Sequence, residues 1–269
     1  MGSRYLVDLA DVLRASGLLV HEEPGWQTRA RGSGGYESGR PTHVMVHHTA
    51  SNPGSDPSGD VGYIAHGADA APIANLYLSR SGQVWVIAAG ATNTNGSGSD
   101  SWGGGVPVDS MNTHAIGIEA ANAGTGEPWP QAQTDSYLTI CRALCAAYSI
   151  PNPHHVRGHA EWAPGRKIDP AGPPRWANGS ETWRMDDYRT DVALDEPTPP
   201  IPIPIPDPQE YDMAFMIRDR DTGAIGVVYG DGKLTGIDGT NLEQWTAALG
   251  AWIDVDSNVF NDFATKGAV

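Results

Sequence analysis

A short segment of the chain carries an imidazole, an ammonium and a carboxylate. His159 is followed by Lys167 and Asp169, and a Pro-Gly pair between them indicates one bent loop. A second source of imidazole, the adjacent pair His47 and His48, lies far upstream at the end of an apolar run. Two histidines and one carboxylate are the protein ligands of a catalytic zinc site with an open fourth position. The sequence therefore predicts a zinc hydrolase.

The residues around these groups indicate which side chains can face a common site. His47 ends an apolar strand pattern, so His48 should point to the opposite face and only one of the two can face the site. Lys167 and Asp169 alternate with Ile168, which places both on one side of an extended segment. The same two side chains could equally form a solvated surface pair.

Glu119 follows an apolar run, and its carboxylate is either a buried structural group or a catalytic base. Hydrolysis of an amide at zinc needs a base for the water and a cation for the developing oxyanion. Glu119 and Lys167 are the available candidates for these two roles.

The pattern of the first 195 residues predicts an α/β domain with a single central mixed sheet flanked by helices. We expect a hairpin turn at 79–82 and, from the dense Gly, Ser, Asn and Asp of 89–110, a long surface loop that acts as a lid or binding loop. The expected helices cover 4–16, which ends at Gly17, and 131–148; the expected strands cover 43–47, 73–78, 83–88 and 115–120.

The rest of the chain predicts a linker and a second module. Residues 196–210 contain alternating prolines, which favour an extended polyproline II spacer. Residues 211–269 predict a small α+β module, with strands over 214–218, 224–229 and 233–237 and helices over 241–249 and 258–264. A core of this size is marginal alone, so self-association or a partner is expected.

Composition excludes several classes of protein. The 269 residues carry a net charge of −15, which argues against nucleic acid as a partner. No apolar run approaches the roughly 20 residues of a membrane span. The N-terminus shows no secretory signal, so another agent would have to release the protein. Cys141 and Cys145 are either a metal or redox pair or, as we favour, two small buried groups.

Three motifs, in this order, resemble those of the type 2 N-acetylmuramoyl-L-alanine amidases. That family includes phage endolysins, bacterial wall-recycling amidases and animal peptidoglycan recognition proteins. The resemblance covers about residues 20–180. The motifs are Val46-His47-His48-Thr49-Ala50, Ala115-Ile116-Gly117-Ile118-Glu119, and the segment from Gly158 to Asp169.

The resemblance implies a role for each matching residue. His47, His159 and Asp169 match the three zinc ligands, so Zn²⁺ is the expected cofactor. Lys167 matches the cation that polarises the scissile carbonyl, and Glu119 matches the acidic residue that activates water. Asn112, His114 and Trp162 are expected to contact substrate, although hydrogen bonding within the protein explains the first two equally well. Trp102, Trp129 and Trp162 could pave a groove or belong to the core.

Two positions depart from the family pattern. Many members carry a Tyr eight residues before the hairpin glycine, where this chain has Ala74, and Tyr77 is out of register. Without this Tyr, Glu119 is the residue expected to activate the water. Many members also use Cys as the third ligand, where this chain has Asp169, and a carboxylate is an acceptable zinc ligand.

These features together predict an enzyme that cuts the amide between N-acetylmuramic acid and L-alanine in peptidoglycan. The stretch 119–130 resembles amidases from phages of actinobacteria, which favours an endolysin made in the host cytoplasm and released through a holin. The alternatives are a noncatalytic peptidoglycan-binding module and a virion-associated wall hydrolase. The C-terminal module is expected to bind the wall or to form a homo-oligomer.

Overall fold

The chain divides into two compact units, Met1–Pro197 and Thr198–Val269. The computed structural model describes residues 4–36, 39–55, 57–67, 69–151, 154–179, 181–194, 215–221, 225–228, 234–237, 253–258 and 260–261. The predicted linker, 196–210, lies outside these residues.

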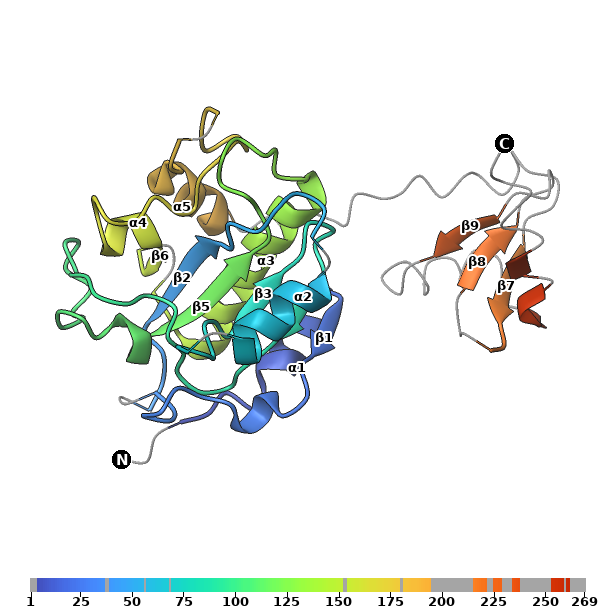
Figure 1. Cartoon of the computed structure of the whole chain (residues 1–269), viewed down its shortest axis with the longest axis horizontal. Helices are drawn as coiled ribbons and strands as arrows, with labels where there is room; N and C mark the ends of the chain where they lie inside the picture. The colour runs from blue at the N-terminus through green and yellow to red at the C-terminus, as the bar shows by residue number, and fades with distance from the viewer. Residues whose placement is uncertain are drawn as a thin grey trace. The chain divides into compact units, whose positions relative to one another are not determined.

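A six-stranded sheet forms the centre of the first unit (Figure 1). The strands lie in the order β1-β4-β3-β5-β2-β6, and only the pair β3–β4 is antiparallel. The strands are β1 (Val20–Glu22), β2 (His43–His48), β3 (Leu76–Leu78), β4 (Val84–Val86), β5 (Ala115–Ala120) and β6 (Val156–Gly158).

Helices cover both faces of this sheet. α3 (Gln131–Tyr148) lies on one face, and α1 (Leu9–Arg14) and α5 (Met185–Ala193) pack beside it (Figure 1). α2 (Pro57–Gly62) runs into the π-helical turn η2 (Tyr63–Gly67) on the other face. The remaining short elements are η1 (Trp26–Thr28), η3 (Met111–Thr113) and α4 (His159–Trp162). The predicted α/β fold with one mixed sheet is confirmed.

Side-chain alternation decides which residues of the central strands reach the site. Successive side chains of a strand point to opposite faces. Alternate residues of β2 and β5 enter the main core under α3: Val44, Val46, Ile116 and Ile118. Met45 and Ala115 belong instead to a small cluster that contains Trp162. By the same alternation, His47 and Glu119 lie on the face opposite α3.

The strongest sequence patterns match the structure closely. β5 and α3 have the predicted bounds, and α3 ends where Ser149 adopts a left-handed backbone (φ 53°). β3 and β4 form the predicted hairpin, with Gly82 at φ 83°, but both strands are shorter than expected. The N-terminal helix is also shorter, and its predicted apolar residues are nevertheless buried: Leu6, Leu9, Ala10 and Leu13.

The segment 89–110 is not wholly a surface loop. It has no strand or α-helix, but Ala89, Ala91 and Asn95 are buried. The Asn75 side chain satisfies its backbone, since Nδ2 donates to the carbonyls of Ala88 (2.9 Å) and Gly90 (2.7 Å). Irregular backbone can be buried when side chains supply such bonds, and the composition of the loop does not reveal them.

The second unit contains a four-stranded sheet in the order β10-β7-β8-β9. Its first three strands match the predicted ones, and β10 was not predicted from the sequence. The predicted helix at 241–249 lies outside the described residues. In the described part of the chain, no helix has the length and apolarity to cross a membrane. The strands are β7 (Phe215–Asp219), β8 (Ile225–Val228), β9 (Leu234–Ile237) and β10 (Ile253–Val255).

Candidate active site

Strand register places the side chains of three neighbouring strands in a row. His47 of β2 pairs with Glu119 of β5, and Glu119 in turn pairs with Tyr77 of β3. Neighbouring strands lie about 4.8 Å apart, so these side chains are adjacent on one face. His159 follows Gly158, which pairs with Val46 of β2. The row therefore lies toward the carboxyl ends of the parallel strands, where α/β sheets usually bind ligands.

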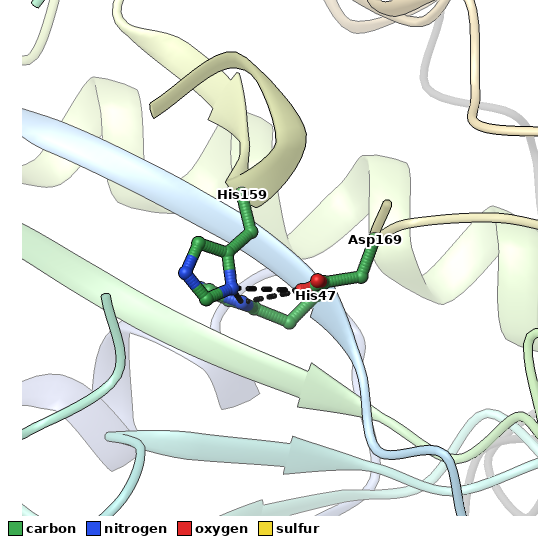
Figure 2. A group of neighbouring side chains, drawn as sticks. All are labelled: His47, His159 and Asp169. Atoms are coloured by element: carbon green, nitrogen blue, oxygen red, sulfur yellow. Dashed lines mark hydrogen bonds and ion pairs between the residues drawn. The ribbon is translucent and has the colours of Figure 1, made fainter. Parts of the chain in front are cut away.

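Two imidazoles and one carboxylate converge at the end of this row (Figure 2). His47 Nδ1 lies 2.9 Å from His159 Nδ1 and 2.9 Å from Asp169 Oδ2. His159 Nδ1 lies 3.0 Å from the same carboxylate oxygen. All three side chains are buried, and among the described residues they form the only such group of metal-binding type. The structure thus brings together the three predicted ligands.

The donor set fits a bound cation. His159 Nε2 lies 2.8 Å from the carbonyl oxygen of Asn95. A carbonyl oxygen only accepts hydrogen bonds, so Nε2 carries a proton, and in the Nε2–H tautomer Nδ1 offers a lone pair. Nδ1 therefore meets Asp169 Oδ2 as one acceptor meeting another. A metal ion among the three atoms removes that repulsion, and imidazole nitrogen with carboxylate oxygen suits zinc.

Burial tunes the protonation of these ligands. Burial and the neighbouring His159 lower the pKa of His47 to about 4, which keeps the ring neutral near pH 7. Neutral imidazole and ionised carboxylate are the forms that bind a metal.

Buried hydrogen bonds hold the backbone of each ligand. The Tyr137 hydroxyl, from α3, accepts the His47 N–H (2.8 Å) and donates to the His47 carbonyl (2.9 Å). His48, on the other face of β2, accepts the Ala171 N–H at Nδ1 (3.0 Å) and so anchors the chain just after Asp169. Only one histidine of the pair faces the site, as predicted.

The turn that carries His159 is also braced, but it is not a plain loop. His159 begins the short helix α4, and the Glu161 side chain accepts the Gly158 N–H (3.0 Å). Glu161 also pairs with Arg157 (3.0 Å) and Arg189 (2.9 Å). The expectation of one bent loop is therefore wrong for its first four residues, because Glu161 caps a helical turn there.

Glu119 lines an open pocket beside the metal-binding group. Its Oε2 is buried and has no hydrogen-bond partner among the described residues. Burial, followed by the charge of Asp169, raises the pKa of Glu119 well above its usual value, and Lys167 opposes this shift. The pocket is lined by Thr49, Asp60, Tyr63, Ile64, Ile73 and Glu119.

Lys167 lies close enough to influence both the ligands and the carboxylate. Its charge lowers the pKa of His47 and of Glu119. Within the described part of the chain, the structure gives its ammonium no hydrogen-bonded or ion-paired partner. The positive charge of Lys167 therefore lies beside the same site and is available to interact with a ligand.

The three side chains predicted to contact substrate form hydrogen bonds within the protein. Trp162 has 0% exposed surface and donates from Nε1 to the Gly96 carbonyl (3.0 Å), so it cannot line a groove. Trp129 is likewise buried in the core. Asn112 is 8% exposed and accepts the Asn95 N–H (2.8 Å). Trp162 and Asn112 are buried because they form hydrogen bonds with the backbone of the segment 89–110.

His114 lies at the opposite end of the strand from Glu119. It precedes β5, and five residues of strand separate the two by about 16 Å. Its Nδ1 donates to the Ser110 carbonyl (2.8 Å). The direction of the strand therefore carries His114 away from Glu119, and its predicted contact with substrate stays a prediction.

The sequence reading missed Asp60 and Tyr63 in the pocket wall. Asp60 Oδ2 accepts the Tyr77 hydroxyl (3.0 Å), and the Tyr63 ring is 58% exposed. Both lie in or next to α2, which was not predicted in this segment rich in Gly, Ser, Asp and Pro. The buried trio Val61, Ile64 and Ala65 has helical spacing and was the available signal.

Known proteins share features with this chain. Solved structures similar to it include an AmpD derivative, at 20% identity and a TM-score of 0.46, covering 65% of this chain and 94% of that one. Amidase LysC from Clostridium intestinale has 15% identity and a TM-score of 0.43, with coverages of 64% and 96%. AmiD from E. coli, solved with an anhydro-N-acetylmuramic acid peptide, has 21% identity and a TM-score of 0.36, with coverages of 58% and 61%.

No curated protein sequence matches the chain. The model of a protein family, described as N-acetylmuramoyl-L-alanine amidase, matches residues 37–172. This range holds half of the chain and includes all three convergent ligands together with Glu119 and Lys167. The chain therefore belongs to the N-acetylmuramoyl-L-alanine amidase family, and the enzyme class predicted from its motifs is confirmed.

Proposed function

We propose that this amidase uses zinc, held by His47, His159 and Asp169, to cut the bond between N-acetylmuramic acid and L-alanine. The observation that carries the proposal is the convergence of two imidazole nitrogens and one carboxylate oxygen within 3.0 Å of one another. When bound, zinc supplies Lewis acidity, which polarises a carbonyl and makes a water molecule more acidic.

Glu119 is proposed as the general base. Its unpartnered Oε2 in the pocket is able to accept a proton from the attacking water. Its raised pKa makes it a stronger base, and the positive charge added by a cation at the three ligands would keep it ionised. The proton then passes to the departing L-alanine nitrogen, because Glu119 acts as an acid once it is protonated.

Lys167 is proposed to stabilise the negative charge that develops on the scissile carbonyl oxygen. An ammonium without an internal partner costs little to redirect toward substrate. Stabilisation of this kind acts only where charge develops in the transition state. Lys167 is thus expected to affect kcat more than substrate binding.

The test uses the full chain on purified peptidoglycan and counts newly exposed L-alanine amino termini. We expect release that stops in chelator and returns with zinc. Release that persists in chelator contradicts the zinc assignment. Binding of peptidoglycan with no release by zinc-loaded protein supports the noncatalytic alternative instead.

We further propose that the protein is a phage endolysin with residues 1–195 as the amidase domain, 196–210 as the linker and 211–269 as the wall-binding or self-associating module. The resemblance of 119–130 to amidases of actinobacterial phages supports this role. Lysis of actinobacterial cell walls, and absence of the protein from purified virions by mass spectrometry, test it. The role of the module is tested by comparing the full chain with a chain that ends at residue 195. The two measurements are co-sedimentation with cell walls and oligomeric state.

A further inference from the structure

The ring of His159 is oriented from behind by a loop backbone. Its Nε2 donates to the Asn95 carbonyl (2.8 Å), which belongs to the irregular segment 89–110. A metal-binding histidine usually donates its second ring nitrogen to such a partner, and this bond selects the tautomer. The position of one carbonyl oxygen therefore controls which nitrogen of His159 faces Asp169.

Side chains, rather than a strand ladder, hold that carbonyl in place. The Asn95 N–H donates to Asn112 Oδ1 (2.8 Å), and Arg166 Nη2 donates to the Asn95 carbonyl (3.2 Å). Trp162 fixes the next residue through the Gly96 carbonyl (3.0 Å). Trp162 and Arg166 follow His159 in the chain, whereas Asn112 comes from η3, a separate element.

The bond from Asn112 comes from a different part of the chain than the bonds from Trp162 and Arg166. Trp162 and Arg166 both belong to the segment that carries His159, although Trp162 also packs against Met45 of β2. Asn112 precedes β5, whose strand pairs directly with the His47 strand. Its bond to the Asn95 N–H therefore links the backbone behind His159 directly to the element that leads into β5, beside the strand that carries His47.

We propose that Asn112 is a positioning residue for His159: its side-chain oxygen fixes Asn95, whose carbonyl then holds His159 with Nδ1 directed at the metal site. This inference rests on the proposed zinc site. It gives Asn112 a role in the metal centre in place of the substrate contact predicted from the sequence.

The experiment measures zinc affinity of the full chain by competition with a chromophoric chelator. We compare Asn112→Ala, which lacks the acceptor, with Asn112→Asp, which retains one. Asn93→Ala is the matched control, because Asn93 lies in the same loop but donates to the Ala70 carbonyl (2.9 Å). Loss of a partner behind a metal ligand typically weakens metal binding about 10- to 100-fold, and we expect this for Asn112→Ala only.

A second readout is the tautomer of His159 in zinc-free protein, from long-range proton–nitrogen NMR of labelled histidines. We expect Nε2–H in the unmodified chain and in Asn112→Asp, and a mixture of tautomers in Asn112→Ala. A merely structural role for Asn112 would change the melting temperature without changing the tautomer.

The outcomes separate the two proposals. Unchanged zinc affinity in a folded Asn112→Ala chain overturns the positioning role. If that variant does not fold, Asn112→Ser replaces it, and an Nδ1–H tautomer of His159 in the unmodified chain overturns the role without any variant. An unmodified chain that shows the Nε2–H tautomer but binds no zinc overturns the zinc site and leaves the orientation of His159 supported.

Discussion

Two pairs of histidines lie at opposite ends of β2. At its carboxyl end, His47 and His159 direct nitrogen atoms at each other and at Asp169. At its amino end, His43 and His155 stack face to face, with ring centroids 4.3 Å apart. The first pair meets a carboxylate oxygen at hydrogen-bonding distance, and the second pair has the charges of both Asp100 and Arg157 nearby.

The surroundings of the second pair explain why it is not of metal-binding type. His155 Nδ1 donates to the Thr42 carbonyl (2.8 Å), and Arg157 lies over the Trp102 ring at 4.7 Å. Burial, followed by the charge of His155, lowers the pKa of His43; Asp100 opposes this shift and Arg157 adds to it. The cation of Arg157 also repels a metal ion. Histidine content alone thus does not make a metal site; convergence of lone pairs with a carboxylate does.

The largest expected effect separates the two pairs directly. Removing a ligand with His159→Ala should abolish zinc binding and reduce amidase activity to background, because the catalytic Lewis acid is lost. His155→Gln should retain both. Zinc content by atomic emission and release of L-alanine amino termini measure the difference. Equal loss in the two variants would contradict the contrast.

The next effect concerns the carboxylate beside the first pair. Glu119→Gln keeps the size of the side chain but removes the base, and general-base catalysis contributes about 10²- to 10⁴-fold. We expect kcat to fall by that range with zinc affinity nearly unchanged. Steady-state kinetics on a soluble muramoyl-peptide, with zinc titration alongside, check this. Full activity of the variant would remove Glu119 from the mechanism.

Lys167, near the carboxyl end of β2, should affect catalysis, whereas Arg157, near the second histidine pair, should affect stability. Lys167→Met is expected to lower kcat about 10²- to 10³-fold, as for the loss of one oxyanion-stabilising group. Arg157→Met should instead lower the melting temperature, because Arg157 pairs with Glu161 (3.0 Å) and packs on Trp102. Kinetics and thermal unfolding of both variants show the split, and a kcat loss confined to Arg157→Met would reverse the assignment.

The smallest effect is a pH dependence of stability at the amino end. Burial, with a smaller contribution from His155, lowers the pKa of His43 to about 3. Its ordinary value is about 6.5, so the folded state binds fewer protons than the unfolded state between these values. Stability contributed by neutral His43 is present above about pH 6.5 and lost as pH falls toward 3.

His43→Gln should remove this dependence. Each pKa unit corresponds to about 1.4 kcal/mol, so burial of His43 should account for a few kcal/mol between pH 7 and pH 4. Urea unfolding of the two chains in chelator, at several pH values, measures the slopes. Parallel slopes would show that His43 is protonated without cost in the folded state.

Local patterns in the sequence predicted several of the main elements of the fold. The apolar run of 115–120 and the amphipathic spacing of 131–148 gave elements with the observed bounds. α2 and β10 were missed because their segments are short and mix polar with apolar residues. The surface assignment of 89–110 failed in part because the side chain of Asn75, just before β3, bonds the backbone where the segment begins, at Ala88 and Gly90.

The sequence by itself determined the types of residue in the site and the family to which its motifs belong. His47, Glu119, His159, Lys167 and Asp169 could be named because their motifs occur in a fixed order. Only the tertiary structure decided what surrounds them: that Glu119 pairs in register with His47, that Trp162 is buried, and that Asn112 bonds the loop behind His159. Periodicity reports contacts a few residues apart, whereas these bonds join residues such as His47 and Asp169, separated by 122 positions, and depend on sheet register.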